Sequence, residues 1–240
     1  YEDIGERMVG DIDFLVSKNN YIKATKILLK NNYKKSDAFL FENHRHFPRL
    51  LNKNKIAAVE VHREMVISPY HKTFNFNFIE KQIKLLSDNF SVLSYEDQIV
   101  HNLISNQVND YNYIYKRINL KNYYDFYLLL KHTNKEKTLQ YSIRCFKNSN
   151  VCFSIYSITF NIESINILNL KEKLYYYTLL NLLSLRFLSI IHAKLIGFYL
   201  YVSNSILILR KSYKNKEYQK FILSKITDFS WYKRRFLGIK

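Results

Sequence analysis

The pattern of apolar and polar positions varies along the chain, and its first clear feature is an alternation at residues 10–16. These residues read Gly-Asp-Ile-Asp-Phe-Leu-Val. Side chains of a β-strand point alternately to its two faces, so a period of two predicts a strand. Asp11 and Asp13 would share one face of this strand, and its apolar side chains would share the other.

A second alternation occupies residues 55–62, which read Lys-Ile-Ala-Ala-Val-Glu-Val-His. Val59 and Val61 would point to one face of a second strand, and Glu60 and His62 to the other. A third carboxylate would thus emerge from an apolar strand that can pair beside the first.

Elsewhere, apolar residues recur three or four positions apart, as one face of an α-helix requires. A helix is predicted directly after the turn at residues 17–20. Residues 74–78 fit a short strand or an aromatic loop, and residues 151–160, rich in β-branched and aromatic residues, fit a strand or a buried helix. Further helices are predicted at residues 77–86, 95–107, 120–132 and 135–147.

Residues 174–209 are strongly apolar, with charged or polar breaks at Arg186, His192 and Lys194. The longest uncharged piece, residues 195–209, has 15 residues. A helix needs about 20 apolar residues to cross a membrane. We therefore predict two buried helices and no membrane span, with a membrane-associated segment as the alternative.

The two strands together present three carboxylates, at Asp11, Asp13 and Glu60. Like charges held side by side repel unless a cation lies between them, and Mg²⁺ takes oxygen ligands of this kind. Three carboxylates on adjacent strands are the arrangement that two-metal phosphoryl transfer uses. Gly10 would let a backbone or a phosphate come close. The other interpretation of an Asp-x-Asp motif is a solvated strand end.

A polar segment, Asn-His-Arg-His-Phe-Pro-Arg, precedes the second strand. We predict that His46 helps to hold this loop and that Arg45 or Arg49 meets a substrate phosphate. A metal-ligand role for His44 and His46 lacks a third partner at a defined spacing. His62 either contacts a substrate group or a metal-ligating carboxylate, or is only a hydrogen-bonded strand-end histidine.

Arg7, residues 10–16 and residues 59–62 together resemble a known family. An Arg, a Gly-Asp-Ile-Asp-x-Leu-Val strand, a helix and a Val-Glu-Val-His strand are similar to the bacterial nucleotidyltransferase family of the polymerase-β-like superfamily. The resemblance is close over residues 1–65 and looser over residues 94–130.

Two further positions of the family have counterparts in the looser region. His101 and Asp125 stand where the family tends to have a His and an Asp in successive helices, although both could be polar groups packed inside for structural reasons. The superfamily's phosphate-binding Gly-Ser, or Lys-Gly in this family, precedes the acidic strand. The sequence begins at Tyr1 without that element, so we expect an N-terminally truncated or a diverged member.

The resemblance implies an α/β (α+β) fold, in which a nucleotidyltransferase-like mixed sheet is followed by a mostly helical C-terminal region. Residues 1–70 would form a partial catalytic core, and residues 71–240 a mostly α-helical domain.

The resemblance also implies a metal-dependent enzyme that transfers a nucleoside monophosphate from a nucleoside triphosphate such as ATP to an unidentified acceptor. The cofactor would be Mg²⁺ or Mn²⁺, and the acceptor a small molecule, an RNA or a protein. The implied site consists of the catalytic and metal-binding residues Asp11, Asp13 and Glu60 and the nucleotide-binding residues Arg7, Gly10 and His62. The other interpretation of Arg7 is a surface ion pair with Glu2 or Glu6.

Charge supports an alternative from another class of function. The 240 residues contain 37 Lys and Arg against 20 Asp and Glu, a net charge of +17, and residues 206–240 contain ten basic residues against two acidic ones. Such a balance favours polyanionic partners. The alternative is a non-catalytic basic protein of the same fold that binds RNA or a protein partner.

Cysteine content bears on the compartment of the protein. Cys145 and Cys152 are the two cysteines of the sequence, and we predict that both are reduced and buried rather than bridged. No signal peptide is visible at the start of the sequence. We therefore expect a cytoplasmic protein.

Overall fold

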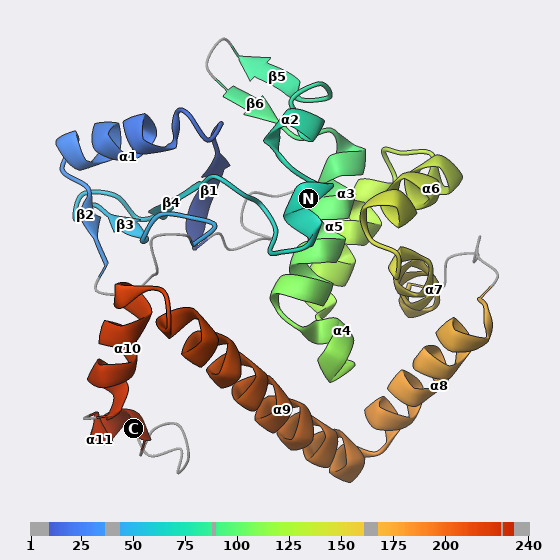
Figure 1. Cartoon of the computed structure of the whole chain (residues 1–240). Helices are drawn as coiled ribbons and strands as arrows, with labels where there is room; N and C mark the ends of the chain where they lie inside the picture. The colour runs from blue at the N-terminus through green and yellow to red at the C-terminus, as the bar shows by residue number, and fades with distance from the viewer. Residues whose placement is uncertain (1–9, 37–43, 88–89, 161–167, 227, 233–240) are drawn as a thin grey trace. The chain divides into compact units, whose positions relative to one another are not determined.

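The computed structural model forms two compact units, and each is described by itself (Figure 1). The first contains the described residues up to Arg186, and the second those from Phe187 onward. The division into a catalytic core of residues 1–70 and a helical domain of residues 71–240 stays a prediction. The structure describes residues 10–36, 44–87, 90–160, 168–226 and 228–232.

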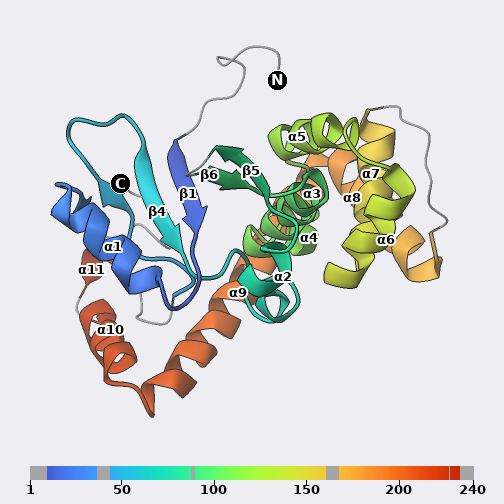
Figure 2. The same cartoon turned by 90° about the horizontal axis from the view of Figure 1, so that it is seen from above.

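The first unit begins with a four-stranded mixed sheet in the order β1-β4-β3-β2. These strands are β1 (Asp11–Leu15), β2 (Lys34–Lys35), β3 (Leu50–Leu51) and β4 (Ala58–His62). The pair β1 and β4 is parallel (Figure 2), whereas β3 is antiparallel to both β4 and β2. Both strands predicted from alternation are confirmed, and so is the mixed sheet.

The register of β1 against β4 places the acidic positions side by side. Asp13 lies opposite Glu60, and one step further along Phe14 lies opposite Val61. Because the strands are parallel and in step, alternate side chains of both point to the same face. The polar face of the sheet therefore carries the carboxylates of both strands.

The opposite face of the sheet packs against helix α1 (Tyr21–Lys30), which follows β1 as predicted. Val59 and Val61 are buried there together with Tyr21 and Leu50. Burying one such side chain contributes about 1.5–3 kcal/mol, so this small core fixes which face of β4 points outward.

Helices make up most of the rest of the first unit. Their bounds, with two short strands and two short helical turns, are η2 (Tyr70–Lys72), α2 (Phe76–Ile79), β5 (Lys84–Ser87), β6 (Phe90–Val92), α3 (Tyr95–Ile104), the π-helical η3 (Ser105–Asn109), α4 (Asn112–Tyr115), α5 (Leu120–Leu130), α6 (Lys135–Cys145), α7 (Ser149–Thr159) and α8 (Leu170–Ser184). The helices predicted at residues 95–107, 120–132 and 135–147 are confirmed.

Two predicted segments need comment. Residues 77–86 do not form the predicted helix: α2 ends at Ile79, and the hairpin strand β5 starts at Lys84. Residues 151–160, which fitted either a strand or a buried helix, belong to helix α7. Every residue of α7 from Val151 to Ser157 is buried, which explains why its composition lacks the polar stripe of a surface helix.

The core between these helices is rich in aromatic rings. Phe126 of α5 stacks on Tyr156 of α7 at 3.9 Å between ring centroids and meets Phe153 edge-on at 4.9 Å. Cys145 and Cys152 are free thiols buried in the same core, as predicted.

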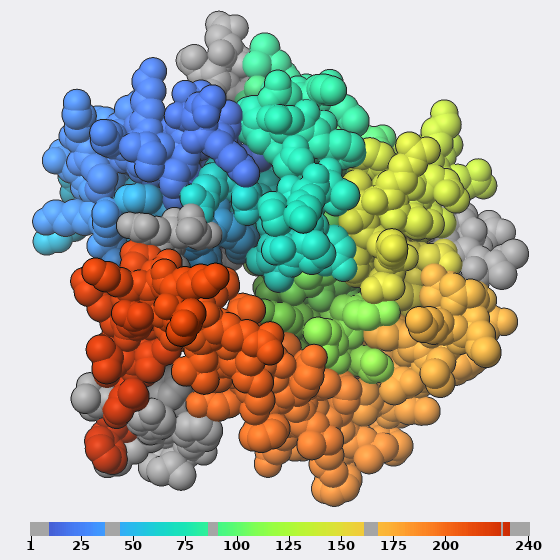
Figure 3. Space-filling model, viewed as in Figure 1, coloured from blue at the N-terminus to red at the C-terminus, as the bar shows by residue number. Residues whose placement is uncertain are grey.

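The described part of the second unit contains α9 (Arg186–Ser212) from its second residue onward, α10 (Lys216–Ile226) and α11 (Phe229–Tyr232). The prediction of two buried helices over residues 174–209 is wrong. Leu179 is the one buried residue of α8, and α9 has none. Figure 3 shows the side chains of α9, in orange, at the surface of the view. Among the described helices, α9 alone is long and apolar enough to cross a membrane, as judged by length and composition.

Candidate active site

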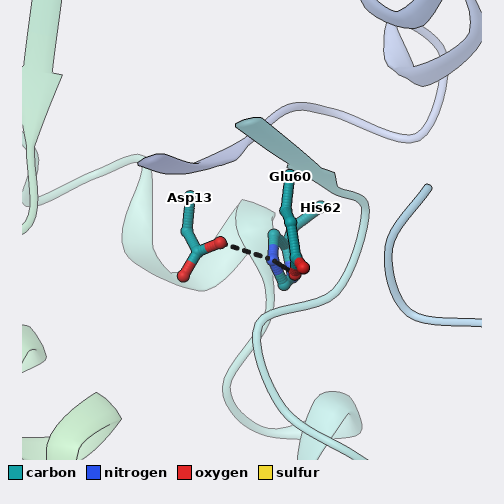
Figure 4. A group of neighbouring side chains, drawn as sticks. All are labelled: Asp13, Glu60 and His62. Atoms are coloured by element: carbon teal, nitrogen blue, oxygen red, sulfur yellow. Dashed lines mark hydrogen bonds and ion pairs between the residues drawn. The ribbon is translucent and has the colours of Figure 1, made fainter. Parts of the chain in front are cut away.

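Strands β1 and β4 bring Asp13, Glu60 and His62 together (Figure 4). One ligand atom from each of these side chains lies within 4.8 Å of the other two. The Nε2 atom of His62 is 3.3 Å from Asp13 Oδ1 and 3.5 Å from Glu60 Oε2. The parallel register produces this cluster directly, because it sets residues 13 and 60 opposite one another.

Asp11 joins the same site through an arginine. The Nε atom of Arg49 donates to Glu60 Oε1 at 3.1 Å, and its Nη2 atom donates to Asp11 Oδ2. Arg49 directly precedes β3, the strand that pairs with β4 on the side away from β1. All three carboxylates predicted from the sequence therefore belong to one connected group.

Imidazole rings adjoin the carboxylates. The rings of His44 and His46 are 4.3 Å apart between centroids, and those of His46 and His62 are 4.9 Å apart. The Nδ1 atom of His46 is 2.8 Å from the carbonyl oxygen of Phe47, which can only accept, so this nitrogen is the donor. This contact within the loop agrees with the predicted role of His46 in holding it.

Several groups of the site have shifted pKa values. The hydrogen bond from His62 is the main reason that the pKa of Asp13 is lowered, so Asp13 is ionised at neutral pH. Burial is the main reason that the pKa values of His44 and His101 are lowered to about 4, and the charge of Arg45 adds to the effect at both. Both rings are therefore neutral at neutral pH and add no positive charge of their own.

The remaining predicted site residues are placed as follows. Gly10 lies at the start of β1, and a Cβ atom there would meet nothing within 4 Å, so local packing does not require glycine. Arg7 lies outside the described residues. Arg45 donates to the carbonyl oxygen of Met65 at 2.9 Å, whereas Arg49 contacts the carboxylates.

Sequence reasoning missed the contact of Arg49 with both strands. Its position before a two-residue strand gave no periodic signal, and the pairing of β3 with β4 appears only in the folded sheet. His101 was considered only by resemblance. In the folded protein His101 lies close enough to Asp13 and His62 to interact with both electrostatically.

The donor atoms fit a divalent metal ion. Asp13, Glu60 and His62 offer two carboxylates and one imidazole nitrogen, a set that suits Mg²⁺ through its oxygens and Mn²⁺ through both atom types. Arg49 gives a second indication, because its guanidinium lies between Asp11 and Glu60, where two like charges require a cation.

Comparison with known families matches residues 1–153 to a family described as uncharacterised nucleotidyltransferase. The matched segment includes both acidic strands and the helices up to the start of α7. Comparisons with curated proteins and with solved structures gave no match. Because the family match covers more than half of the chain, the protein belongs to the uncharacterised nucleotidyltransferases, whose activity in general is transfer of a nucleotide group.

Proposed function

We propose that this protein is a metal-dependent, cytoplasmic nucleotidyltransferase that moves a nucleoside monophosphate from a nucleoside triphosphate to an acceptor. The observation that carries the proposal is the convergence of Asp13, Glu60 and His62 within 4.8 Å on adjacent strands of a chain that belongs to this family. The acceptor is a small molecule, an RNA or a protein.

Two groups of side chains would hold divalent metal, Mg²⁺ or Mn²⁺. Asp13, Glu60 and His62 form the first, and Asp11 with the other oxygen of Glu60 forms the second. When bound, such ions stabilise the negative charge on the attacking and leaving oxygens of phosphoryl transfer.

The chain's own residues supply orientation and charge. Before a cation binds, the hydrogen bond from His62 holds the carboxylate of Asp13 and keeps it ionised. A metal ion bound through the same nitrogen would take the place of its proton. Glu60, with one oxygen toward each metal position, would help to activate the acceptor hydroxyl, which loses its proton to water as its oxygen attacks the α-phosphate and pyrophosphate leaves. Arg7 and Gly10 are proposed to contact the nucleotide phosphates.

The test is Asp13→Asn, which keeps the size of the side chain and removes its charge. We expect nucleoside triphosphate binding in the presence of Mn²⁺ to weaken roughly tenfold or more, since a charged ligand is lost. Isothermal titration calorimetry measures the affinity, and Glu80→Gln, at an exposed position of the same unit, is the matched control. Unchanged metal-dependent binding in Asp13→Asn would refute the assignment.

Net charge favours a second candidate function. The +17 balance, with basic residues gathered between residues 210 and 225, suits a non-catalytic protein that docks on RNA. The two candidates differ in what they depend on, because polyanion binding weakens steeply with salt, whereas binding at the carboxylates requires divalent metal.

A further inference from the structure

Arg49 divides the two oxygens of Glu60 between two cation positions. Oε1 accepts the hydrogen bond from Arg49, while Oε2 faces His62 at 3.5 Å and His46 at 3.7 Å. The same guanidinium also holds Asp11. The guanidinium therefore lies on the Asp11 side of Glu60, apart from the cluster that Glu60 forms with His62.

A divalent ion held by Asp11 and Glu60 would need the oxygens that Arg49 now occupies. A guanidinium and a metal ion at hydrogen-bonding distance from the same oxygens repel each other strongly. Arg49 and a metal ion on this side of Glu60 thus exclude each other. At the cluster of Asp13, Glu60 Oε2 and His62 the described contacts come from imidazole nitrogens, which can give up a proton, and none comes from a guanidinium.

The side chain of Arg49 can leave without disturbing the fold. It is 46% exposed, whereas the side chain of Glu60 is 14% exposed. Its backbone is anchored, because its carbonyl oxygen accepts from the Ser36 nitrogen at 2.8 Å and the next residue, Leu50, is fully buried. Only the side chain of Arg49 needs to change its rotamer. Because the backbone stays fixed, the guanidinium remains near the carboxylates.

We propose that Arg49 is an internal counter-ion that neutralises Asp11 and Glu60 in the free protein and is exchanged for the second metal ion when a nucleoside triphosphate binds. The released guanidinium then pairs with phosphate oxygens, which its planar fork matches. This inference rests on the proposed function. It adds that the second metal ion and the nucleotide bind cooperatively. The metal ion releases the guanidinium to pair with the phosphates, and the phosphates stabilise the guanidinium away from the carboxylates.

The exchange predicts opposite effects on two ligands when the guanidinium is removed. Without Arg49, Mn²⁺ alone should bind the second position more tightly, because the competing cation is gone. The Mn²⁺ complex of a nucleoside triphosphate should bind more weakly, because a phosphate partner is lost. An arginine that served only as a phosphate ligand, or only as a structural ion pair, would not produce this change of sign.

The experiment compares wild type, Arg49→Gln and Arg49→Lys by electron paramagnetic resonance of Mn²⁺, without and with a non-hydrolysable triphosphate analogue. For Arg49→Gln we expect the weaker Mn²⁺ site to tighten roughly threefold, as suits a half-exposed ion pair. Binding of the analogue should weaken roughly tenfold. Arg49→Lys keeps the charge but not the fork, so metal affinity should stay near wild type while analogue binding falls. Arg117→Gln, which removes an exposed charge elsewhere, is the control.

The outcomes separate this inference from the proposed function. If wild type binds Mn²⁺ and the analogue, but Arg49→Gln moves both affinities in one direction or moves neither, the exchange is refuted and the proposed function stands. If wild type binds neither ligand, both proposals fall. Should Arg49→Gln fail to fold, an Arg49→Lys variant with wild-type affinity for the analogue would refute the exchange.

Discussion

His62 lies between two carboxylates, with its side chain only 8% exposed. The sequence allowed either a contact with the acidic group or a simple strand-end hydrogen bond, and the 3.3 Å contact with Asp13 places the ring inside the acidic group. A nitrogen donor among oxygen donors changes the metal preference, because Mn²⁺ accepts imidazole more readily than Mg²⁺ does. The residue that looked ambiguous in the sequence is thus the one that distinguishes this donor set from three carboxylates alone.

The acidic positions could be predicted because alternation in a strand depends on local sequence alone. The partner of those positions could not. Arg49 reaches Asp11 and Glu60 across 38 and 11 positions of sequence, and only the pairing of β3 with β4 brings it there. At the residue scale, the sequence therefore indicates which groups bear charge, and the fold determines which charges meet.

His101 provides a prediction on pH. In the unfolded chain an imidazole takes up a proton near pH 6.5, whereas burial in the folded protein lowers the pKa of His101 to about 4. Between these values the unfolded state binds more protons, so folding stability falls as the pH falls. From pH 7 to pH 5, His101 should contribute a loss of about 2 kcal/mol in the free energy of unfolding.

Urea denaturation at pH 7 and pH 5 measures this loss. His101→Leu should lose less stability than wild type over the interval, because the titrating group is gone. His132→Leu, at an exposed histidine, should keep the wild-type difference. Equal pH dependence in wild type and His101→Leu would contradict the prediction.

At the scale of elements, burial on one face of β4 controls what the other face presents. Val61 is fully buried against α1 and its neighbours, and Glu60 and His62 flank it on the polar face. In β1 the apolar face is less complete: Phe14 packs on the same core, but Ile12 is 52% exposed. Among the described strands, β1 lies at the edge of the sheet. The position of the carboxylates thus depends mainly on the packing of β4.

Val61→Ala should therefore destabilise the first unit by about 2 kcal/mol, from lost burial and the cavity left behind. The same substitution at Val202, which is 37% exposed in α9, should cost little. Urea denaturation followed by circular dichroism measures both. A Val61→Ala variant as stable as wild type would show that the valine face of β4 does not hold the sheet.

Helices with a clear start and a stripe of apolar residues were predictable. Ser94 caps α3 by accepting from the Asp97 nitrogen at 3.1 Å, as the Ser-x-x-Asp motif indicates. Where apolar residues occupy every side of a helix, the periodicity of the sequence does not distinguish a helix from a strand or show which side is buried. This explains the two interpretations of α7, and it explains the error for α9, whose apolar residues we assigned to a core that the structure does not provide.

At the scale of the whole molecule, charge and site point to different ligands. The net charge of +17 attracts any polyanion, whereas the carboxylate site would bind a divalent metal ion and a nucleoside triphosphate. The segment from the end of α9 through α10 contains several exposed lysines, including Lys214, Lys216 and Lys220. A basic surface of this kind would serve an enzyme whose acceptor is RNA as well as a protein that only binds RNA.

The last prediction separates these contributions. Binding of a labelled single-stranded RNA, followed by fluorescence anisotropy in EDTA, should weaken as salt rises, since bound lysines release counterions. Replacing Lys214, Lys216 and Lys220 by Gln should reduce the slope of log affinity against log salt by about 2, because each phosphate contact contributes about 0.7.

The matched control removes three exposed lysines of α1 instead, Lys23, Lys26 and Lys30. If this variant lowers the slope as much, the charge acts diffusely and the segment after α9 has no special role. Asp13→Asn should leave RNA binding in EDTA unchanged, because no metal takes part. Loss of metal-dependent nucleotide binding in Asp13→Asn, together with intact RNA binding, would then assign the two ligands to two separate parts of the chain and favour RNA as the acceptor.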